Sequence, residues 1–300
     1  MSSPPYKSFA MVGAAGHIGK HIFAALHERT TATSPILVIT RTSSSSADAI
    51  PPSPNVKIAK VEDYKNVEQV AAILRAHHIE VLVSAANWQT EDGICAEEMA
   101  LVDAARAAGV KLFVPSEFGV SSVDAPTGLW KAKDDVAKYM KEIGLPSTRF
   151  FTGQFFSWIA IACGHPSTGK INLVVGTGDT PGSFTADEDV GGFVAHVLTT
   201  LPPSELNNRI FRIEGERASY GEIAARVGLP VVRVENVPSD SEQLSLFCTM
   251  AQKLFEQGYG SSGWDHVLKK DGAERAGGAN ALWTGHVWRK VSKEDFAKTG

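Results

Sequence analysis

Long uninterrupted apolar runs are missing from this sequence of 300 residues. Glycine, serine, aspartate, lysine or histidine interrupts every candidate stretch short of the ~20 apolar residues that a membrane helix needs. The N-terminal MSSPPYKSFAMVGAAG also lacks a basic segment followed by an apolar core, which argues against a secretory signal. We therefore expect a cytoplasmic protein that does not bind membranes.

Cysteine is scarce, and positive charge is not in excess. The three cysteines, Cys95, Cys163 and Cys248, are far apart and form no CxxC pair, which argues against a disulfide framework and a zinc site. Histidines and carboxylates show no metal-ligand spacing either, so no metal is expected. With a net charge of −4 and scattered Lys and Arg, the chain offers no basic stripe for nucleic acid. The expected partner is a small molecule.

What the chain does contain is the composition of a globular protein, 43% hydrophobic and 21% charged, with a regular alternation of patterns. Strand-like runs occupy Phe9–Val12, Ile36–Thr40, Val81–Ser84, Leu112–Pro115 and Thr148–Thr152, and helix-like stretches occupy Ile18–Glu28, Val67–His77, Glu97–Ala108 and Trp130–Ile143. This rhythm predicts βαβ units and hence an α/β fold with a doubly wound parallel sheet of about six strands.

A glycine-rich turn, GAAGHIG, lies between the first predicted strand and the first predicted helix. Glycines spaced three apart at this point allow a tight turn, close approach of the backbone to a pyrophosphate and close helix packing, while the helix N-terminus faces the phosphates. The predicted cofactor contacts here are Gly13, Ala15, Gly16, His17, Ile18 and Gly19. For His17, a solvent-facing side chain is the alternative.

The second predicted strand ends in VITRT, about twenty residues after the turn, where NAD-binding proteins carry Asp or Glu. Arg41 occupies this place. A guanidinium can form two hydrogen bonds with a 2′-phosphate, whereas no carboxylate is present in the motif to bind a free 2′-hydroxyl. We therefore expect NADPH rather than NADH as the cofactor, the alternative being a solvated loop arginine.

The chain is expected to have an NADP-binding Rossmann core at residues 1–152. From Gly153 onward the pattern loosens into short helices such as Gly191–Thr200, so residues 153–300 are predicted to form mostly a smaller, interleaved substrate-side region with segments returning to the core sheet. The Ser- and Pro-rich segment Arg41–Asn55 predicts a surface loop, either a tolerated insertion or a lid on the cofactor side.

The run KLFVPSEFG at Lys111–Gly119, together with GAAGHIG and Arg41, resembles the atypical short-chain dehydrogenases of the NmrA-like and isoflavone reductase-like group. Three further stretches are similar to this family: WKAKDDVAKYMKEIGLPSTRF, GQFF at 153–156 and ADEDVGGFVAHVL at 186–198. The resemblance covers roughly residues 8–228. It implies a dinucleotide-binding protein, and in many members of the group a reductase.

The resemblance also implies a catalytic residue. In the reductases of this family a lysine on the helix after PSEFG acts as general acid or base near the nicotinamide, and the matching position is Lys133, with Lys131 as the fallback. Lys133 is therefore also a predicted cofactor contact. A lysine on an ordinary exposed helix face is the alternative. By the same analogy Phe118 packs near the nicotinamide. No tyrosine has a lysine four residues on, which argues against ordinary short-chain dehydrogenase chemistry.

Other candidate contacts follow strand ends. Small residues after the strand at Val81–Ser84 can let the backbone approach the cofactor, or can simply pack well. The candidate cofactor contacts are Ala85, Ala86 and Asn87 after this strand, and Ser116 in PSEFG. Aromatic residues after the strand at Thr148–Thr152 either line the binding site of a planar substrate or belong to the core. These are Phe155, Phe156 and Trp158, which with Phe118 make up the predicted substrate contacts.

We expect an NADPH-dependent reductase that transfers hydride to a small, planar or aromatic molecule, with Lys133 as general acid or base. The bond reduced is a conjugated double bond, benzylic ether, carbonyl or imine. Two alternatives stay open: a non-catalytic NADP(H)-sensing regulator with a protein partner, and a redox-neutral isomerase or lyase. The tail from Pro238, with Trp264, Trp283 and Trp288, either caps the pocket or makes a homodimer contact.

Overall fold

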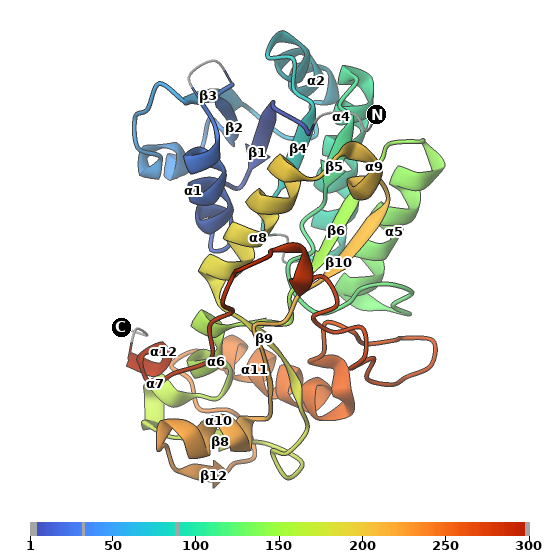
Figure 1. The fold of residues 1–300 in the computed structure, drawn as a ribbon. Coiled ribbons are helices and arrows are strands. Elements are labelled where there is room, and N and C mark those ends of the chain that lie inside the picture. The colour runs from blue at the N-terminus through green and yellow to red at the C-terminus, as the bar shows by residue number, and fades with distance from the viewer. Residues whose placement is uncertain (1–4, 32–33, 88–89, 298–300) are drawn as a thin grey trace. The chain divides into compact units, whose positions relative to one another are not determined.

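The computed structural model describes residues 5–31, 34–87 and 90–297, and its chain divides into two compact units (Figure 1). Unit 1 comprises Met1–Phe118, Ser122–Phe150 and Val190–Phe211. Unit 2 comprises Gly119–Ser121, Phe151–Asp189 and Arg212–Gly300. Of the stretch 153–300, residues 190–211 therefore lie in unit 1. Each unit is assembled from three separate pieces of chain.

Unit 1 contains a five-stranded sheet in the order β3-β2-β1-β4-β5. Its strands are β1 (Phe9–Val12), β2 (Ile36–Arg41), β3 (Val56–Val61), β4 (Val81–Ser84) and β5 (Leu112–Val114). All four pairings are parallel, and β1 pairs with both β2 and β4. The predicted parallel α/β fold is confirmed. Because the strand order reverses beside β1, the carboxyl ends of β1 and β4 form the switch point at which such sheets bind ligands.

The strand predicted at Thr148–Thr152 is present but is bonded differently from the five strands of the parallel sheet, of which β3 had no predicted range. It is β6 (Thr148–Phe151), which pairs with β10 (Arg209–Arg212) in a separate two-stranded sheet. A single parallel bridge from Phe113 to Ser147 and a 2.9 Å hydrogen bond from the Phe113 N–H to the Pro146 carbonyl connect it to β5. The strand therefore lies next to the parallel sheet without forming a full ladder with it.

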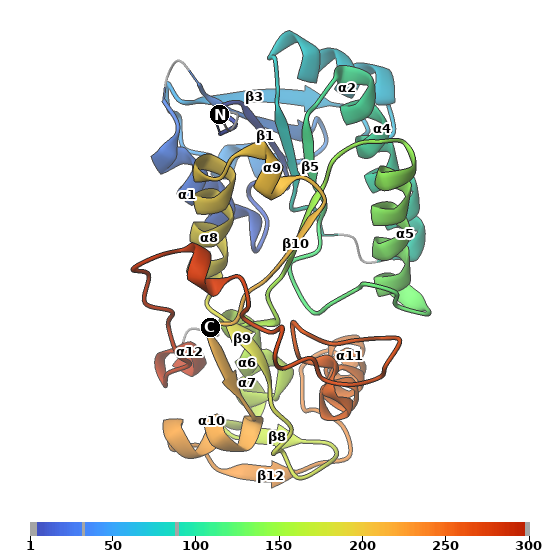
Figure 2. The same cartoon turned by 45° about the vertical axis from the view of Figure 1, so that its right-hand side comes forward.

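Helices cover both faces of this sheet (Figures 1 and 2). One face packs on α2 (Val67–Ala76), α4 (Met99–Ala108) and α5 (Gly128–Glu142). The other is covered by α1 (Gly19–Arg29) and α8 (Asp187–Thr200), which contains the helix predicted at Gly191–Thr200. A Cβ on Gly191 would lie 2.4 Å from the main-chain oxygen of His21, so glycine allows α8 to approach α1 closely.

Short elements complete unit 1: η1 (Ser45–Ala49), α3 (Glu91–Gly93), the π-helical turn η2 (Ile94–Glu98) and α9 (Pro203–Leu206). At the amino edge of the sheet, the Glu80 carboxylate accepts hydrogen bonds from the Lys111 ammonium at 2.7 Å and the Lys7 N–H at 2.8 Å. Partial burial raises the pKa of Glu80, but these hydrogen bonds more than offset it and hold the pKa below its ordinary value. Glu80 thus connects the amino ends of β1, β4 and β5.

Unit 2 is built around a three-stranded sheet in the order β11-β9-β7 and a parallel pair of β8 and β12. The elements are β7 (Gln154–Phe155), α6 (Phe156–Ala162), α7 (His165–Thr168), β8 (Ile171–Leu173), β9 (Gly182–Thr185), β11 (Glu216–Ala218), α10 (Tyr220–Val227), β12 (Val231–Arg233), α11 (Glu242–Leu254), η3 (Phe255–Tyr259), η4 (Asn280–Leu282) and α12 (Glu294–Ala297). Its core contains three packed aromatic rings, those of Phe184, Tyr220 and Phe255.

The tail from Pro238 takes part in unit 2. Trp264 is buried and stacks on Tyr259 with ring centroids 4.4 Å apart. Trp283 stacks on His286 at 3.7 Å and meets the edge of Trp288 at 5.9 Å.

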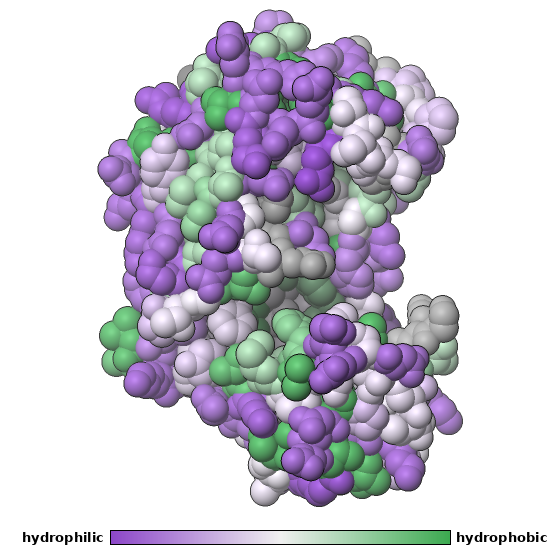
Figure 3. Space-filling view, turned by 180° about the vertical axis from the view of Figure 1, so that it is seen from behind, coloured by the Kyte–Doolittle hydropathy of each residue, from purple (hydrophilic) through white to green (hydrophobic). Residues whose placement is uncertain are grey.

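On the face drawn in Figure 3, hydrophilic residues predominate and apolar ones occur in small groups. A homodimer contact by this tail stays a prediction.

In the part of the chain that the structure describes, no helix is both long enough and apolar enough to cross a membrane.

Candidate functional site

The turn that follows β1 is packed directly against the residues that follow β4. Gly13 has a positive φ of 77°, a conformation that favours glycine. A Cβ on Gly13 would lie 2.5 Å from the main-chain oxygen of Ala85 and 2.8 Å from the nitrogen of Ala86. Glycine is therefore required here both by the backbone conformation and by the space, and the two strand ends at the switch point are in contact.

The other two glycines shape the start of α1. The Gly16 N–H donates to the Gly13 carbonyl at 2.9 Å, and a Cβ on Gly19 would lie 1.9 Å from the same oxygen. No side chain caps α1, and its first turn contains no acidic residue. The positive end of the helix dipole is thus not neutralised by a capping or acidic side chain of α1, while N–H groups of its first turn donate to carbonyls of the glycine-rich turn itself. This cradle fits the pyrophosphate of a dinucleotide.

The side chains within the turn differ in exposure. His17 is exposed, in keeping with the solvent-facing alternative, and Ala15 is half-buried. Ile18 is 8% exposed, so its side chain belongs to the core, and only its backbone at the N-cap of α1 can face a ligand. Cofactor contacts by Ala15, His17 and Ile18 stay predictions.

One hydrogen bond joins the predicted contacts after β4 and β5, and a second one holds Ser116 to a buried carboxylate. Ser116 donates its hydroxyl to the Ala86 carbonyl at 2.7 Å, and its N–H donates to Glu98 Oε1 at 2.7 Å. Glu98 is 1% exposed and was not predicted from the sequence. Ala85 is buried and Asn87 is exposed. A buried carboxylate on η2 therefore fixes PSEFG beside the end of β4.

Arg41 ends β2 with its side chain 47% exposed. Its guanidinium carbon lies 5.4 Å from the centroid of the Tyr64 ring, within cation–π distance. Burial raises the pKa of the Tyr64 hydroxyl, so this ring is neutral beside the cation. Glu97 Oε2 lies 3.6 Å from Arg41 Nη1, which is longer than a charge-assisted hydrogen bond. Arg41 therefore keeps N–H groups available to a ligand.

Lys133 and Lys131 both lie on α5 but have different surroundings. Lys133 is half-buried and donates to the main-chain oxygen of Glu117 at 3.1 Å. Among the described residues, no carboxylate lies within ion-pair distance of its ammonium. Lys131 is exposed and forms an ion pair with Asp135 at 2.5 Å. The geometry favours Lys133 over the fallback residue, and its catalytic role stays a prediction.

A buried ionic network that the sequence did not reveal surrounds Lys133. It joins Glu117, which accepts the Lys133 hydrogen bond, to Asp134, the next residue in the chain. Arg149, 9% exposed in its side chain, donates through Nε to Glu117 at 2.8 Å and pairs through Nη2 with Asp134 at 3.1 Å. Ser122 donates to the Glu117 carboxylate at 2.8 Å, and Lys138 pairs with Asp134 at 2.7 Å. Because Glu117 and Asp134 are connected through one guanidinium, the PSEFG segment and α5 are tied together.

The predicted aromatic contacts are divided between the units. Phe118 in unit 1 has a φ of 30°, is 6% exposed, and stacks on Phe150 at 6.1 Å. In unit 2, Phe156 is completely buried, which favours the core alternative for this ring. Phe155 and Trp158 are half-buried, and Trp158 meets Phe247 edge-on at 6.1 Å. Contacts of these aromatics with nicotinamide or substrate stay predictions.

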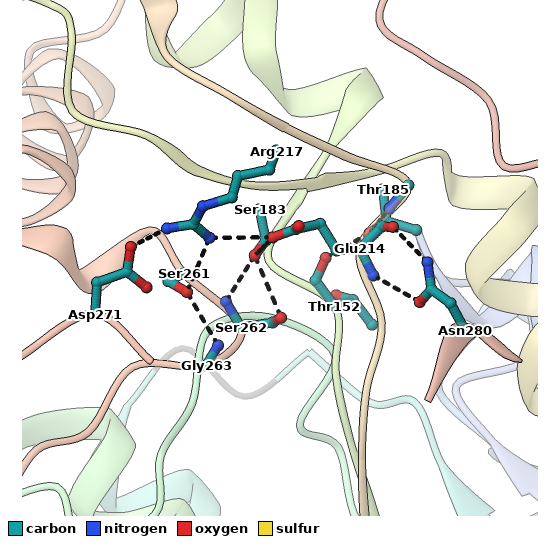
Figure 4. A network of polar contacts seen from close by, with 11 residues as sticks. Thr152, Ser183, Thr185, Glu214, Arg217, Ser261, Ser262, Gly263, Asp271 and Asn280 are labelled. Atoms are coloured by element: carbon teal, nitrogen blue, oxygen red, sulfur yellow. Dashed lines mark hydrogen bonds and ion pairs between the residues drawn. The ribbon is translucent and has the colours of Figure 1, made fainter. Parts of the chain in front are cut away.

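Unit 2 has its own buried polar network (Figure 4). The Ser183 hydroxyl on β9 donates to Glu214 at 2.5 Å and accepts from the Ser262 N–H at 2.9 Å. Arg217 on β11 pairs with Glu214 at 3.3 Å and with Asp271. These contacts attach the tail segment around residues 261–271 to the sheet of unit 2, so we assign the network a structural role.

Comparisons with known proteins agree on one family. The NmrA-like family model matches residues 5–241 of the chain. The chain is 30% identical over 230 residues to "Oxidoreductase BOA1" of Botryotinia fuckeliana (strain B05.10), which covers 71% of this chain and 72% of the relative. It is 27% identical over 219 residues to "Isoflavone reductase homolog IRL" of Zea mays, covering 67% of this chain and 66% of the relative.

The fold has a solved counterpart in the binary complex of leucoanthocyanidin reductase with NADPH from Vitis vinifera. The TM-score is 0.71 at 23% identity, over 97% of this chain and 98% of that chain. The fold similarity therefore also includes most of the tail beyond residue 241, where the family match ends. Together with the relatives, it confirms the resemblance inferred from the glycine-rich turn and PSEFG.

Proposed function

The chain belongs to the NmrA-like family, and from this premise we propose that it is an NADPH-dependent reductase. Its relatives include proteins named as oxidoreductases, and one solved structure with a similar fold is a reductase bound to NADPH. The single observation that carries the proposal is the cradle at the switch point. There Gly13 is packed against Ala85, and α1 begins without a capping side chain or an acidic residue.

Unit 1 contains groups that could bind both charged parts of the proposed cofactor, the pyrophosphate and the 2′-phosphate. The positive end of the α1 dipole and the backbone of the glycine-rich turn would bind the pyrophosphate. Arg41, at the end of β2 and with N–H groups to spare, would bind the 2′-phosphate that distinguishes NADPH from NADH. Ser116, fixed to Ala86 and Glu98, would shape the surface on which the rest of the cofactor lies.

NADPH, when bound, supplies the hydride. Reduction of a polar double bond or a benzylic ether also requires one proton, on the atom that receives the electron pair. We assign the donation or relay of this proton to Lys133, because its ammonium is half-buried, free of a carboxylate partner among the described residues, and held by the Glu117 carbonyl. Glu117 and Arg149 are positioning residues in this scheme, since they act through the backbone that holds Lys133.

The proposed substrate is a small planar or aromatic molecule with a conjugated double bond, benzylic ether, carbonyl or imine. We retain Phe155 and Trp158 as candidate substrate contacts because they are partly accessible, and Phe118 as a candidate contact of the nicotinamide. This substrate class rests on the family resemblance and on these aromatic side chains.

The proposal is tested by titrating the purified protein with NADPH and NADH, then following the loss of nicotinamide absorbance with enones, benzylic ethers, aldehydes and imines. We expect tighter binding of NADPH, and its consumption with one of these substrate classes. The Lys133→Ala variant should bind NADPH but hardly turn over. Binding of NADPH without consumption by any compound would contradict the reductase proposal and would favour a dinucleotide-sensing regulator or a redox-neutral reaction.

A further inference from the structure

Glu97 is the acidic residue that the structure places beside Arg41. Its Oε2 lies 3.6 Å from Arg41 Nη1, and its side chain is 23% exposed. This oxygen is buried and has no hydrogen-bond partner among the described residues. The sequence motif at the end of β2 carries no carboxylate, but the fold brings one to the same place from η2.

The position of Glu97 is restricted by its neighbours in the chain. Ile94 and Glu98, in the same π-helical turn, are 0% and 1% exposed, so the backbone that bears Glu97 is anchored in the core. Glu98 is also bonded to the Ser116 N–H at 2.7 Å. The Glu97 side chain can change its rotamer. Because the backbone is fixed, however, the carboxylate stays in the neighbourhood of Arg41.

The two cofactors would meet this carboxylate differently. A 2′-phosphate that binds Arg41 brings up to two negative charges close to Glu97, and like charges repel at this range. A free 2′-hydroxyl is neutral and can donate a hydrogen bond to a carboxylate oxygen. The same side chain therefore opposes NADPH and accepts NADH.

We propose that Glu97 is a specificity-determining residue that limits the preference of this chain for NADPH over NADH. The inference rests on the proposed function, in which Arg41 binds the 2′-phosphate. It predicts that the natural protein binds NADPH in preference to NADH by a smaller factor than Arg41 alone would produce.

The test compares the wild-type chain with Glu97→Gln, which removes the charge and keeps the shape. Dissociation constants are measured for NADPH and NADH, and by competition for 2′,5′-ADP and 5′-AMP, which isolate the adenosine end. The matched control is Glu142→Gln, the same change at an exposed position in the last turn of α5. Arg41→Ala is measured in parallel as an independent test of the proposed function.

At low ionic strength we expect Glu97→Gln to bind 2′,5′-ADP and NADPH up to about fivefold more tightly, the upper end of the range for a partly exposed charge pair. Binding of 5′-AMP and NADH should be unchanged or weaker, and Glu142→Gln should match wild type. In about 1 M salt the gain should largely disappear, since the Debye length is then about 3 Å.

Two different failures can be told apart. If Arg41→Ala loses the preference for NADPH but Glu97→Gln binds 2′,5′-ADP no more tightly than wild type, the inference about Glu97 is overturned and the role of Arg41 stands. If the preference for NADPH survives Arg41→Ala, the proposed function of Arg41 is itself contradicted. Weaker binding of 2′,5′-ADP to Glu97→Gln would also overturn the inference, because Glu97 would then orient Arg41 rather than oppose the phosphate.

Discussion

The ammonium of Lys133 donates to the main-chain oxygen of Glu117 over 3.1 Å. The carboxylate of the same Glu117 is buried against Arg149, which in turn pairs with Asp134, the residue that follows Lys133 in the chain. The contact between Lys133 and Glu117 is thus supported from both ends by one guanidinium. The position of the candidate proton donor depends on residues that do not touch it.

Replacing Lys133 by methionine should lower turnover by about 10²- to 10⁴-fold, the usual contribution of a general acid or base. The dissociation constant of NADPH should change by no more than about twofold, since the phosphate-binding groups lie elsewhere in unit 1. Steady-state kinetics and a fluorescence titration measure both. The control is Lys131→Met, on the same helix and paired with Asp135. An equal loss of turnover in the control would refute the assignment.

Replacing Arg149 by leucine should destabilise the protein by about 3–5 kcal/mol, because two buried carboxylates would lose the buried cation that they share. Glu117 would keep the neutral Ser122 hydroxyl, and Asp134 would keep the exposed Lys138 ammonium. Urea unfolding gives the free energy. Lys138→Met removes a partner of the same Asp134 from an ammonium that is 62% exposed, and should cost about 1 kcal/mol or less. Similar losses in the two variants would show that burial of the network does not matter.

Replacing Gly13 by alanine should weaken NADPH binding by at least about tenfold, the equivalent of about 1.4 kcal/mol, because the new Cβ would collide with Ala85 and displace the turn. Gly109 is the matched control. It has the same φ of 77°, but a Cβ there would meet no atom within 4 Å. Gly109→Ala should cost about 1–2 kcal/mol of stability through backbone strain and leave the dissociation constant unchanged. The two effects are separated by titration and thermal unfolding.

Replacing Glu80 by glutamine should make stability less dependent on pH in the acid range. The folded state holds the pKa of Glu80 below its ordinary value, so its contribution to stability is present above pH ~4.5 and is lost as the pH falls through the lowered pKa. The carboxylate is partly exposed, so we expect a difference from wild type of about 1 kcal/mol or less at pH 7. It should shrink as the pH falls below about 4.5 and vanish once the pH is below the lowered pKa. A difference that stays constant over this range would contradict the account.

The features predicted correctly from the sequence are those with a local pattern. Strands and helices produce periodic patterns of apolar residues, so the parallel sheet could be inferred from the sequence alone. The glycine-rich turn could be recognised because Gly13, Gly16 and Gly19 stand between a strand and a helix. Arg41 could be singled out because it ends a strand next to that turn.

What could not be predicted depends on partners distant in sequence. Glu117 and Arg149 are 32 positions apart, and as single residues both resemble solvated surface charges. Glu97 and Glu98 are adjacent, yet one faces Arg41 and the other is buried against Ser116, a difference that arises only when η2 is packed. The pairing of β6 with β10 likewise depends on a strand that follows about sixty residues later.

The three-piece construction of unit 1 has a consequence for synthesis on the ribosome. Once residue 150 has been translated, the whole five-stranded sheet exists, but α8 does not, and the face that it shares with α1 is uncovered. The side chains that close this face, such as Phe193 and Val197, come only after the first part of unit 2. The nascent chain therefore exposes apolar sheet surface for some forty further residues, a period in which chaperones can bind it.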